Sequence, residues 1–553
     1  EENWEYEGVI PHIKYYNPSS MKPKKRKEFM EWYEERIKIG YIYNHAKETE
    51  EYCISDVDIL LESCNKYSLI GYDLTGIDPL SKTTLASWVM NTYLTKYYDF
   101  EKTPIAVLKK DEYDFIKRSF HGGRTEAIRT YRKWTDEELK EGKCGRYVDI
   151  TSLYPSVQFY DDMPYGEPKW VKDIDNDILD YIKNNYGFYE VDIEMNKKEF
   201  ISPLVSHKDG KLMANVEDKE KSVFHSVELI NAVELGKCNI KKIYKGLVFN
   251  KTNEMFKEFV STFLRIKVEA SGEPPFYRKV KMRKEWEEQH NIRYGFIPKP
   301  EKTENSGLRA IAKLILNSLW GKFGQRPDMT TDKYIAPNQL KEWYKLLRMA
   351  KSQIIELKSD EISGDHLFIS YVDKRDNNNT LNNTSIALAA STTANAGMRL
   401  YKELIKLNDR VLYHDTDSII YEYKPTEYNI QLGEYLGEWT CETNGKPIDE
   451  YVSPGAKSYA YKVDKKVKDT KMKGITLNYE NGKKICFDTM KDLIDGKVDK
   501  LITTENIRFN KDKEDTSTLI TTPIIKEVNL TMDKRINKGY YTYPKGYNGK
   551  MFN

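Results

Sequence analysis

Two short acidic segments lie far apart in the chain, and each follows an apolar stretch. Residues 149–155 read Asp-Ile-Thr-Ser-Leu-Tyr-Pro, and residues 413–418 read Tyr-His-Asp-Thr-Asp-Ser. Carboxylates that converge in space can hold divalent cations, and Mg²⁺ prefers oxygen ligands of this kind. Two such ions are the minimum equipment for transferring a nucleotidyl group.

A basic helix is expected between the two acidic segments. Residues 313–324 read Lys-Leu-Ile-Leu-Asn-Ser-Leu-Trp-Gly-Lys-Phe-Gly. At about 100° per residue, one helix face would carry Arg309, Lys313, Asn317 and Trp320. The two cations would bind a triphosphate, and the two other side chains would pack on a base pair that Gly321 allows to approach.

Short strands must position the acids. Residues 146–150 predict a buried strand that ends at Asp149, and residues 411–413 and 418–420 predict a hairpin with the second acidic segment at its tip. We expect Asp149 and Asp417 to be the main metal ligands. The carbonyl of Ile150 would complete one site, and Asp415 would be a secondary or water-mediated ligand.

The three segments resemble, in order, motifs A, B and C of family B DNA polymerases. The subgroup resembled is the protein-primed one of phages, adenoviruses, linear plasmids and related mobile elements, and the similarity runs from about Tyr52 to at least Tyr459. It implies an α+β right-hand fold, with a palm built on an antiparallel sheet, helical fingers, a small thumb and the remnant of an exonuclease domain at the N-terminus. It also implies DNA synthesis from dNTPs on primer–template DNA with two Mg²⁺ ions, for which Mn²⁺ can substitute. In that subgroup a terminal protein supplies the priming hydroxyl.

The resemblance assigns roles to further residues. Tyr154 stands where the family has a steric gate that selects deoxynucleotides, and Trp320 stands where the family usually has Tyr. Phe120 to Arg124 resemble the YxGG-type motif, with Phe in place of Tyr, and Lys457 to Tyr459 match the KxY motif that holds the primer terminus. The expected DNA contacts are Gly122, Gly123, Arg124, Thr416, Lys457 and Tyr459.

An exonuclease remnant is expected near the start of the chain. Tyr52 and Asp56 fit the YxxxD pattern of the third exonuclease motif. Residues 1–55 contain no aspartate, so the earlier motifs of a proofreading site are missing. We therefore expect no proofreading from this chain alone, and the opening Glu-Glu-Asn suggests a fragment or a processed product.

The expected organisation follows the motifs along the chain. The units are 1–75, an exonuclease remnant; 76–140, a linker with the Gly-Gly motif; 141–164, palm; 165–300, an insertion like the terminal-protein region of the subgroup; 301–325, fingers; 326–385, a second insertion with a loop at 376–380; 386–455, palm; and 456–553, thumb and tail.

Composition sets broad limits on the function. The 553 residues carry a net charge of only +2, so nucleic-acid binding would need local basic surfaces. Six cysteines form no CxxC pair, which favours a reducing, intracellular compartment over a disulfide framework or a zinc site. No apolar run approaches about 18 residues, so no membrane span is expected.

Three other functions were weighed against a DNA polymerase. A primer-independent polymerase with primase activity differs only in how the first nucleotide is placed. A reverse transcriptase is disfavoured because the second acidic segment reads Asp-Thr-Asp-Ser instead of YxDD. A DNA-binding scaffold without catalysis is disfavoured because Asp149, Asp417 and Lys313 are all present.

Overall fold

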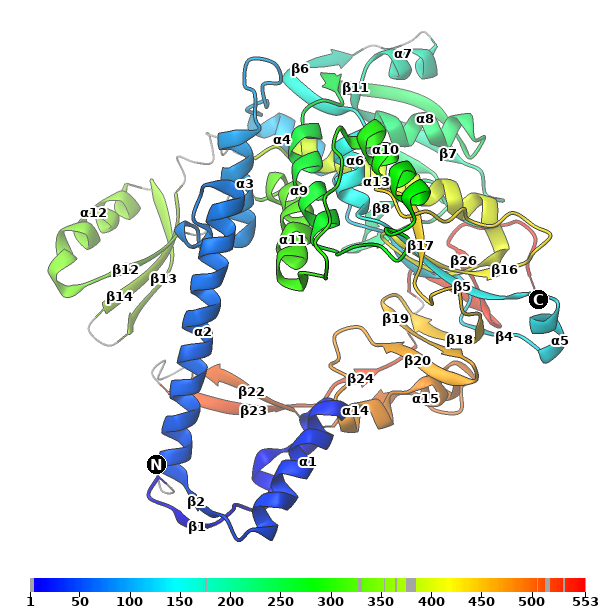
Figure 1. The fold of residues 1–553 in the computed structure, drawn as a ribbon. Helices are drawn as coiled ribbons and strands as arrows, with labels where there is room; N and C mark the ends of the chain where they lie inside the picture. Colours follow the sequence, from blue (N-terminus) through cyan, green and yellow to red (C-terminus); the bar gives the residue numbers. More distant parts are fainter. Residues whose placement is uncertain are drawn as a thin grey trace.

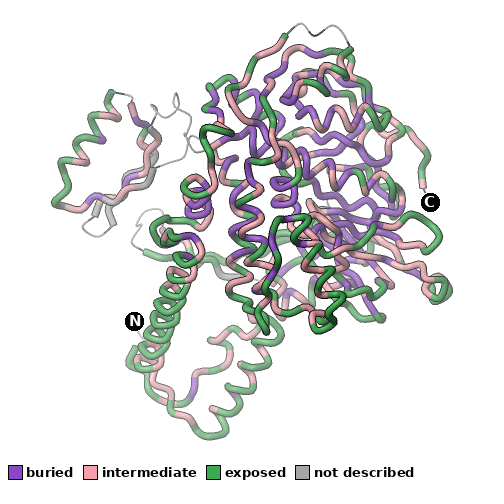
Figure 2. Tube along the Cα trace, turned by 45° about the horizontal axis from the view of Figure 1, so that its top comes forward, coloured by how far each residue is buried: buried purple, intermediate pink, exposed green. Residues whose placement is uncertain are grey.

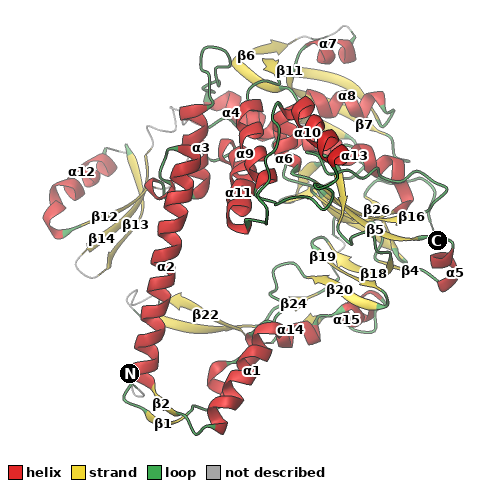
Figure 3. Ribbon diagram, viewed as in Figure 1, coloured by secondary structure: helices red, strands yellow, loops and turns green. Residues whose placement is uncertain are grey.

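A large antiparallel sheet forms the centre of the protein in the computed structural model (Figures 1 and 3). The structure describes residues 4–172, 174, 177–326, 331–352, 354–363, 366–373, 384–504, 506–512, 518–530 and 533–552. Within these ranges no helix has the length and apolarity needed to cross a membrane.

The central sheet brings both acidic segments together. Its main path runs β20-β19-β18-β5-β16-β15-β3, with β17 paired to β5 and β4 to β18. Asp149 on β5 is the register partner of Ser418 on β16, so two segments distant in sequence lie on neighbouring strands. The strands are β3 (Thr125–Ala127), β4 (Tyr131–Lys133), β5 (Cys144–Ile150), β15 (Val411–Asp415), β16 (Ser418–Tyr423), β17 (Trp439–Cys441), β18 (Ile448–Gly455), β19 (Ser458–Val463) and β20 (Lys466–Lys471).

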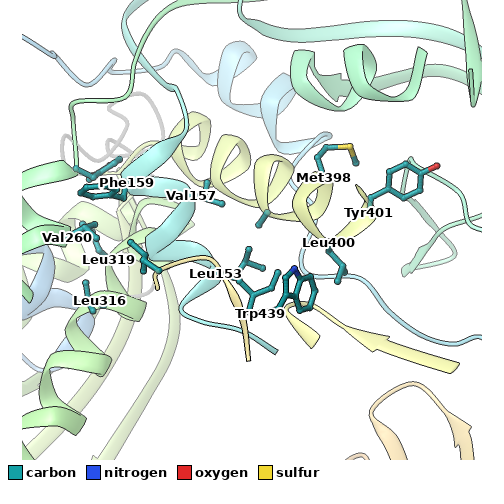
Figure 4. Packing of buried hydrophobic residues seen from close by; sticks show 14 of the residues in the cluster. Leu153, Val157, Phe159, Val260, Leu316, Leu319, Met398, Leu400, Tyr401 and Trp439 are labelled. Atoms are coloured by element: carbon teal, nitrogen blue, oxygen red, sulfur yellow. The ribbon is translucent and has the colours of Figure 1, made fainter. Parts of the chain in front are cut away.

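Helices pack on this sheet through the main hydrophobic core (Figure 4). Leu153 and Val157 of α6 (Leu153–Tyr160) are buried together with Leu316 of α11 (Ser306–Phe323) and Leu400 of α13 (Ile386–Leu407). Helix α9 (Lys257–Glu269) packs along α11, and α3 (Leu85–Lys96) also contacts α11. Helix α9 is therefore a direct neighbour of the helix expected to form the fingers.

Much of the expected first insertion, residues 165–300, folds into a second antiparallel sheet. Its strand order is β10-β7-β11-β6, and β6 begins at Met163, directly after the first palm helix. Helix α13 packs on its strands β6 and β10 and on α8, which joins this unit to the palm. The elements from here to the fingers are β6 (Met163–Lys172), α7 (Ile178–Asn184), β7 (Gly187–Met195), β8 (Ser206–Lys208), β9 (Lys211–Met213), β10 (Lys219–His225), α8 (Ser226–Glu234), β11 (Cys238–Thr252) and α10 (Val280–Tyr294).

The expected second insertion forms a small unit with its own core. A three-stranded sheet in the order β12-β14-β13 packs against α12, with Ile335, Leu346, Ile355 and Ile369 buried between them. Its elements are β12 (Thr331–Ile335), α12 (Leu340–Lys351), β13 (Ile355–Ser363) and β14 (His366–Asp373). The loop expected at 376–380 lies outside the described residues.

Near the N-terminus, the long helix α2 runs from α3 away from the palm, and α1 forms a separate helix beyond it (Figure 1). Helix α2 (His45–Thr75) is exposed on every side between residues 50 and 63 (Figure 2). Helix α1 (Pro23–Lys38) comes next to α14: the backbone N–H of Tyr479 donates to the Met21 carbonyl at 2.8 Å, and the Arg26 guanidinium lies 4.0 Å from the Tyr479 ring centre. Strands β1 (Glu7–Val9) and β2 (Ile42–Asn44) pair beside these helices.

The segment expected to form thumb and tail divides between two places. Strand β19 begins just after the boundary expected at residue 456 and pairs with β18 of the palm sheet. The final strands return to the palm, where Tyr541 and Tyr543 are buried in the main core. The elements are α14 (Tyr479–Lys484), α15 (Phe487–Ile494), β21 (Leu501–Ile502), β22 (Asn506–Lys511), β23 (Leu519–Ile524), β24 (Glu527–Val528), β25 (Arg535–Lys538) and β26 (Tyr541–Pro544).

Candidate functional site

The two principal acids lie side by side at the ends of β5 and β16, two central strands of the palm sheet. The backbone N–H of Ile150 donates to the carbonyl of Asp417 at 2.7 Å, which ties the ends of β5 and β16 together. Thr416 adopts a φ of 53° at the tip of the β15–β16 hairpin, and this left-handed residue turns the chain so that Asp417 comes next to Asp149. Both carboxylates are only partly exposed.

Burial and mutual repulsion make these carboxylates costly to ionise. The pKa of Asp149 is raised from 3.8 to about 7 by burial, by the neighbouring Asp417 and by Glu442, while Lys313 opposes the shift. The pKa of Asp417 is raised by burial and by Asp415, with Lys457 and Lys313 opposing. A divalent cation between the two would relieve this repulsion, so the pair fits such an ion.

The site offers few protein ligands for a metal ion, and this favours Mg²⁺. Within the described residues, no group of three or more His, Cys, Asp and Glu side chains gathers as a metal site. Two carboxylates with a neighbouring backbone carbonyl leave most positions to water and substrate. Mg²⁺ commonly binds in this way, through one or two carboxylates, several waters and substrate phosphates.

Asp415 lies near this pair, and its charge helps to raise the pKa of Asp417. Both of its carboxylate oxygens accept hydrogen bonds from the Lys457 ammonium at 3.1 Å, and the Thr125 hydroxyl also donates to it. The secondary or water-mediated ligand role expected for Asp415 stays a prediction. Its partners give it another role, which is to hold Lys457 beside the hairpin tip.

Helix α11 presents its basic face to the acids. Lys313 is exposed, and it lies close enough to both carboxylates to oppose their raised pKa values. Arg309, one turn earlier, donates through Nε to the Ser271 hydroxyl at 3.1 Å. Asn317 and Gly321 are exposed further along the helix, and a Cβ added at Gly321 would meet no atom within 4 Å.

Sequence reasoning missed one lysine in this group. Lys267 on α9 donates to the Ser152 hydroxyl at 2.9 Å, directly beside the first acidic segment. Its pKa is lowered to about 8 by burial and by the nearby charges of Arg309 and Lys313. Lys267, Arg309 and Lys313 therefore converge and repel one another. An anion bound among them would relieve this repulsion. The only signal in the sequence is an isolated lysine in an amphipathic helix, which does not reveal the contact.

Two aromatic rings close the other side of the site. Tyr154 and Trp320 are stacked with ring centroids 4.1 Å apart. The pKa of Tyr154 is raised to about 12 by burial and by the charges of Asp417 and Asp415, which places this ring at the acids. The stack is therefore positioned to contact whatever binds between the acids and α11.

The Gly-Gly motif contacts the hairpin tip, but its arginine does not face solvent. A Cβ added at Gly123 would lie 2.2 Å from the Thr416 hydroxyl, so only glycine allows this approach, whereas Gly122 is exposed with open space around it. Arg124 is 5% exposed. It pairs with Glu126 at 3.0 Å and donates to the Ser202 carbonyl at 2.7 Å. The DNA contact expected for Arg124 is therefore wrong, because its guanidinium is held inside a buried ion cluster.

The Lys-Ser-Tyr segment lines a cleft of about 490 Å³ next to the acids. The Lys457 ammonium reaches Asp415 from one wall, and its backbone N–H donates to the Tyr413 hydroxyl at 3.0 Å. Tyr459 is buried, and its hydroxyl is hydrogen-bonded to that of Tyr147 at 3.2 Å. Lys457 is thus available to a ligand in the cleft, while Tyr459 mainly supports the wall.

The expected exonuclease remnant lies far from these residues, on α2. Tyr52 is 66% exposed, and its hydroxyl bonds to Asp56 one turn later, which raises the Tyr52 pKa. No further acidic residue of α2 joins this pair in the contacts of the described residues.

A sheet that carries two adjacent acids, helical fingers with converging cations and a small thumb together define a right-hand polymerase fold. The family model for DNA polymerase type B, organellar and viral, matches residues 1–282 and 294–409, which is more than half of the chain. The chain therefore belongs to this family.

Known relatives and a solved structure agree with this fold. A probable DNA polymerase of Podospora anserina is 25% identical over 514 residues, covering 87% of this chain and 37% of the relative. One of Agaricus bitorquis is 24% identical, covering 91% and 58%. The DNA polymerase of Bacillus phage phi29 is 24% identical over 230 residues, covering 39% and 31%. The chain thus spans between about a third and six-tenths of these relatives.

The phi29 DNA polymerase complexed with primer–template DNA and incoming nucleotide has a similar fold. Its TM-score is 0.53 at 17% identity, and the match covers 82% of this chain and 68% of that chain.

Proposed function

We propose that this chain carries out template-directed DNA synthesis, transferring nucleotides from dNTPs to a 3′-hydroxyl. The observation that carries the proposal is the pair of adjacent carboxylates, Asp149 and Asp417, facing the cations of α9 and α11. Membership of a DNA polymerase family and the likeness to the phi29 fold support it.

The acids would hold two divalent cations. Asp149 and Asp417 are the ligands, with the Ile150 carbonyl completing one site, and Mg²⁺ or Mn²⁺ suits these oxygen donors. When bound, the ions would lower the pKa of the primer hydroxyl and neutralise the leaving pyrophosphate.

The chain's own side chains would position the nucleotide. Lys313, Lys267 and Arg309 bind the triphosphate and offset the charge that develops on the leaving group. Tyr154 lies under the sugar as a steric gate, stacked on Trp320. Asn317 and Gly321 lie further along the same helix, toward the nascent base pair.

The primer–template would lie along the hairpin tip and the adjacent cleft. Gly122, Gly123 and Thr416 offer a close approach to a sugar-phosphate chain, and Lys457 is placed at the primer terminus. We propose a protein-primed viral or plasmid replicon as the setting, in keeping with the similar DNA polymerases of Bacillus phages PZA and phi29. A terminal protein as partner is part of this proposal and rests on the family resemblance. We expect no proofreading from this chain, because residues 1–55 contain no aspartate to join Tyr52 and Asp56 in an exonuclease site.

Primer extension tests the proposal. A 5′-labelled primer annealed to a longer DNA template is incubated with dNTPs and Mg²⁺, and products are resolved on a gel. We expect extension by the wild-type chain and none by Asp417→Asn. The matched control is Asp464→Asn, which neutralises an exposed acid in a turn at a φ of 53° that asparagine adopts well. Equal extension by wild type and Asp417→Asn would refute the assignment of the acids.

A further inference from the structure

A small basic cleft lies beside the loop that precedes Lys457. Its volume is about 150 Å³, and its walls come from β3, from the loop at Gly455 and Ala456, from Lys473 after β20, and from residues 533–535. Thr125, another residue of the wall, donates to Asp415. The cleft is therefore adjacent to the proposed polymerase site but separate from the acids and from the basic face of α11.

The two acids of this cleft already have partners. Asp533 is paired with Lys211. Glu126 is buried and accepts from Arg124 at 3.0 Å and from Arg535 at 3.4 Å. Neither acid is free to neutralise a further cation.

Two lysines of the cleft remain without a counter-ion. Neither Lys473 nor Lys534 has a carboxylate within 4 Å of its ammonium in the described part of the chain. Lys534 is partly buried, and burial lowers its pKa. The charges of Lys473 and Lys457 also lower this pKa, whereas Glu126 and Asp533 oppose the shift. Three ammonium groups close enough to repel one another, beside acids that are already paired, leave an excess of positive charge that an anion would neutralise.

We propose that Lys473 and Lys534 bind a backbone phosphate of the duplex held at the proposed polymerase site, behind the primer terminus. The inference rests on the proposed function and adds a contact beyond the acids, α11 and Lys457. A cleft of 150 Å³ has room for about five water molecules at roughly 30 Å³ each, and so for one phosphate group. Each phosphate neutralised by a lysine releases condensed counter-ions, which makes binding dependent on salt.

Salt-dependent DNA binding tests the contact. Fluorescence anisotropy with a labelled primer–template, without metal or dNTP, gives Kd for the wild type and for Lys473→Ala/Lys534→Ala over a range of KCl concentrations. Loss of one or two phosphate contacts should reduce the slope of log K against log[KCl] by about 0.9 for each contact. The control Lys466→Ala/Lys468→Ala removes the same charge from exposed positions on β20 and should retain more of the slope. Equal slopes for the two double variants would overturn the proposal.

A chemical map identifies the source of the phosphate. Neutral methylphosphonate linkages are placed one at a time along primer and template. One or two positions should weaken binding to the wild type severalfold, and this penalty should disappear in Lys473→Ala/Lys534→Ala but persist in Lys473→Arg/Lys534→Arg. A penalty that is the same in the wild type and the alanine variant would overturn the contact.

A third experiment asks whether the cleft binds a free anion instead of a DNA phosphate. Inorganic pyrophosphate is added at constant ionic strength, and its binding to both proteins is measured by calorimetry. Pyrophosphate binding that is lost in the alanine variant, with an unchanged DNA slope, would mean a site for a free anion and would also overturn the proposal. Primer extension by the wild type is scored separately. A methylphosphonate pattern without extension would contradict the proposed function and leave the DNA contact standing.

Discussion

Tyr154 and Trp320 stack with their ring centroids 4.1 Å apart and 29° between the ring planes. The tyrosine lies in the first turn of α6, within the first acidic segment, and the tryptophan comes from helix α11. This stack joins palm and fingers directly at the proposed nucleotide site. Its position gives both rings a part in substrate selection.

Shortening the palm ring should relax sugar discrimination. In Tyr154→Val, the space beneath the sugar opens, and a 2′-hydroxyl no longer collides with the phenol. We expect the ratio of kcat/KM for dCTP to that for CTP to fall by about tenfold or more, since one steric contact contributes about 1–3 kcal/mol to selection. Tyr154→Phe keeps the ring and should retain the wild-type ratio. An unchanged ratio in Tyr154→Val would remove the gate from this residue.

The raised pKa of Asp149 has a consequence for stability without metal. In the unfolded chain this carboxyl loses its proton near pH 3.8, whereas in the folded protein it does so near pH 7. The folded state therefore binds more protons between these values, so the contribution of Asp149 to stability falls as the pH rises from about 4 to 7. In EDTA, Asp149→Asn should have a higher Tm than wild type at pH 8, with little difference at pH 4. The same difference at both pH values would contradict the shift.

The lysine missed by sequence reasoning should act on nucleotide binding. Lys267→Ala removes a partly buried cation next to Arg309 and Lys313, and we expect KM for dNTP to rise about 10–100-fold, as for loss of a charged hydrogen bond of about 1.5–3 kcal/mol. Lys257→Ala on the same helix, where the lysine pairs only with Glu254, is the control. Steady-state kinetics at saturating DNA measure the effect. A rise in KM for DNA alone would assign Lys267 elsewhere.

The buried ion cluster under the hairpin should dominate local stability. Glu126→Ala would leave Arg124 and Arg535 buried without their shared partner, which should cost about 3–5 kcal/mol in the free energy of unfolding. Glu137→Ala, at an exposed acid in α5 (Asp136–Lys140), should cost less than about 1 kcal/mol. Urea unfolding followed by circular dichroism compares them. Similar midpoints for both variants would show that the cluster is not needed for stability.

The parts of the site that sequence could predict depend on local patterns. Asp149 lies near the end of β5 and Asp417 in the turn after β15, and short strands that end in acids can be recognised from a few residues. The face of α11 follows from helical periodicity alone. The family resemblance supplied their order and the right-hand fold.

The remaining features depend on contacts between distant segments. Lys267 reaches Ser152 only because α9 packs along α11, and nothing near Lys267 in sequence records that packing. Arg124 beside two glycines resembles a DNA contact, but Glu126 and the distant Arg535 bury it. Residue type indicates what a side chain can bind, and tertiary packing decides whether it is exposed to do so.

The return of the last strands to the palm orders events during synthesis of the protein. The Thr542 backbone N–H donates to the Ile128 carbonyl at 2.9 Å, and Tyr543 lies in the same core as Val148, next to Asp149. A growing chain therefore carries its acidic centre above an incomplete hydrophobic core until residues 541–543 have left the ribosome. Contacts of such long sequence separation form slowly and leave apolar surface exposed meanwhile. The core that supports the acidic centre is thus completed only after residues 541–543 have been synthesised.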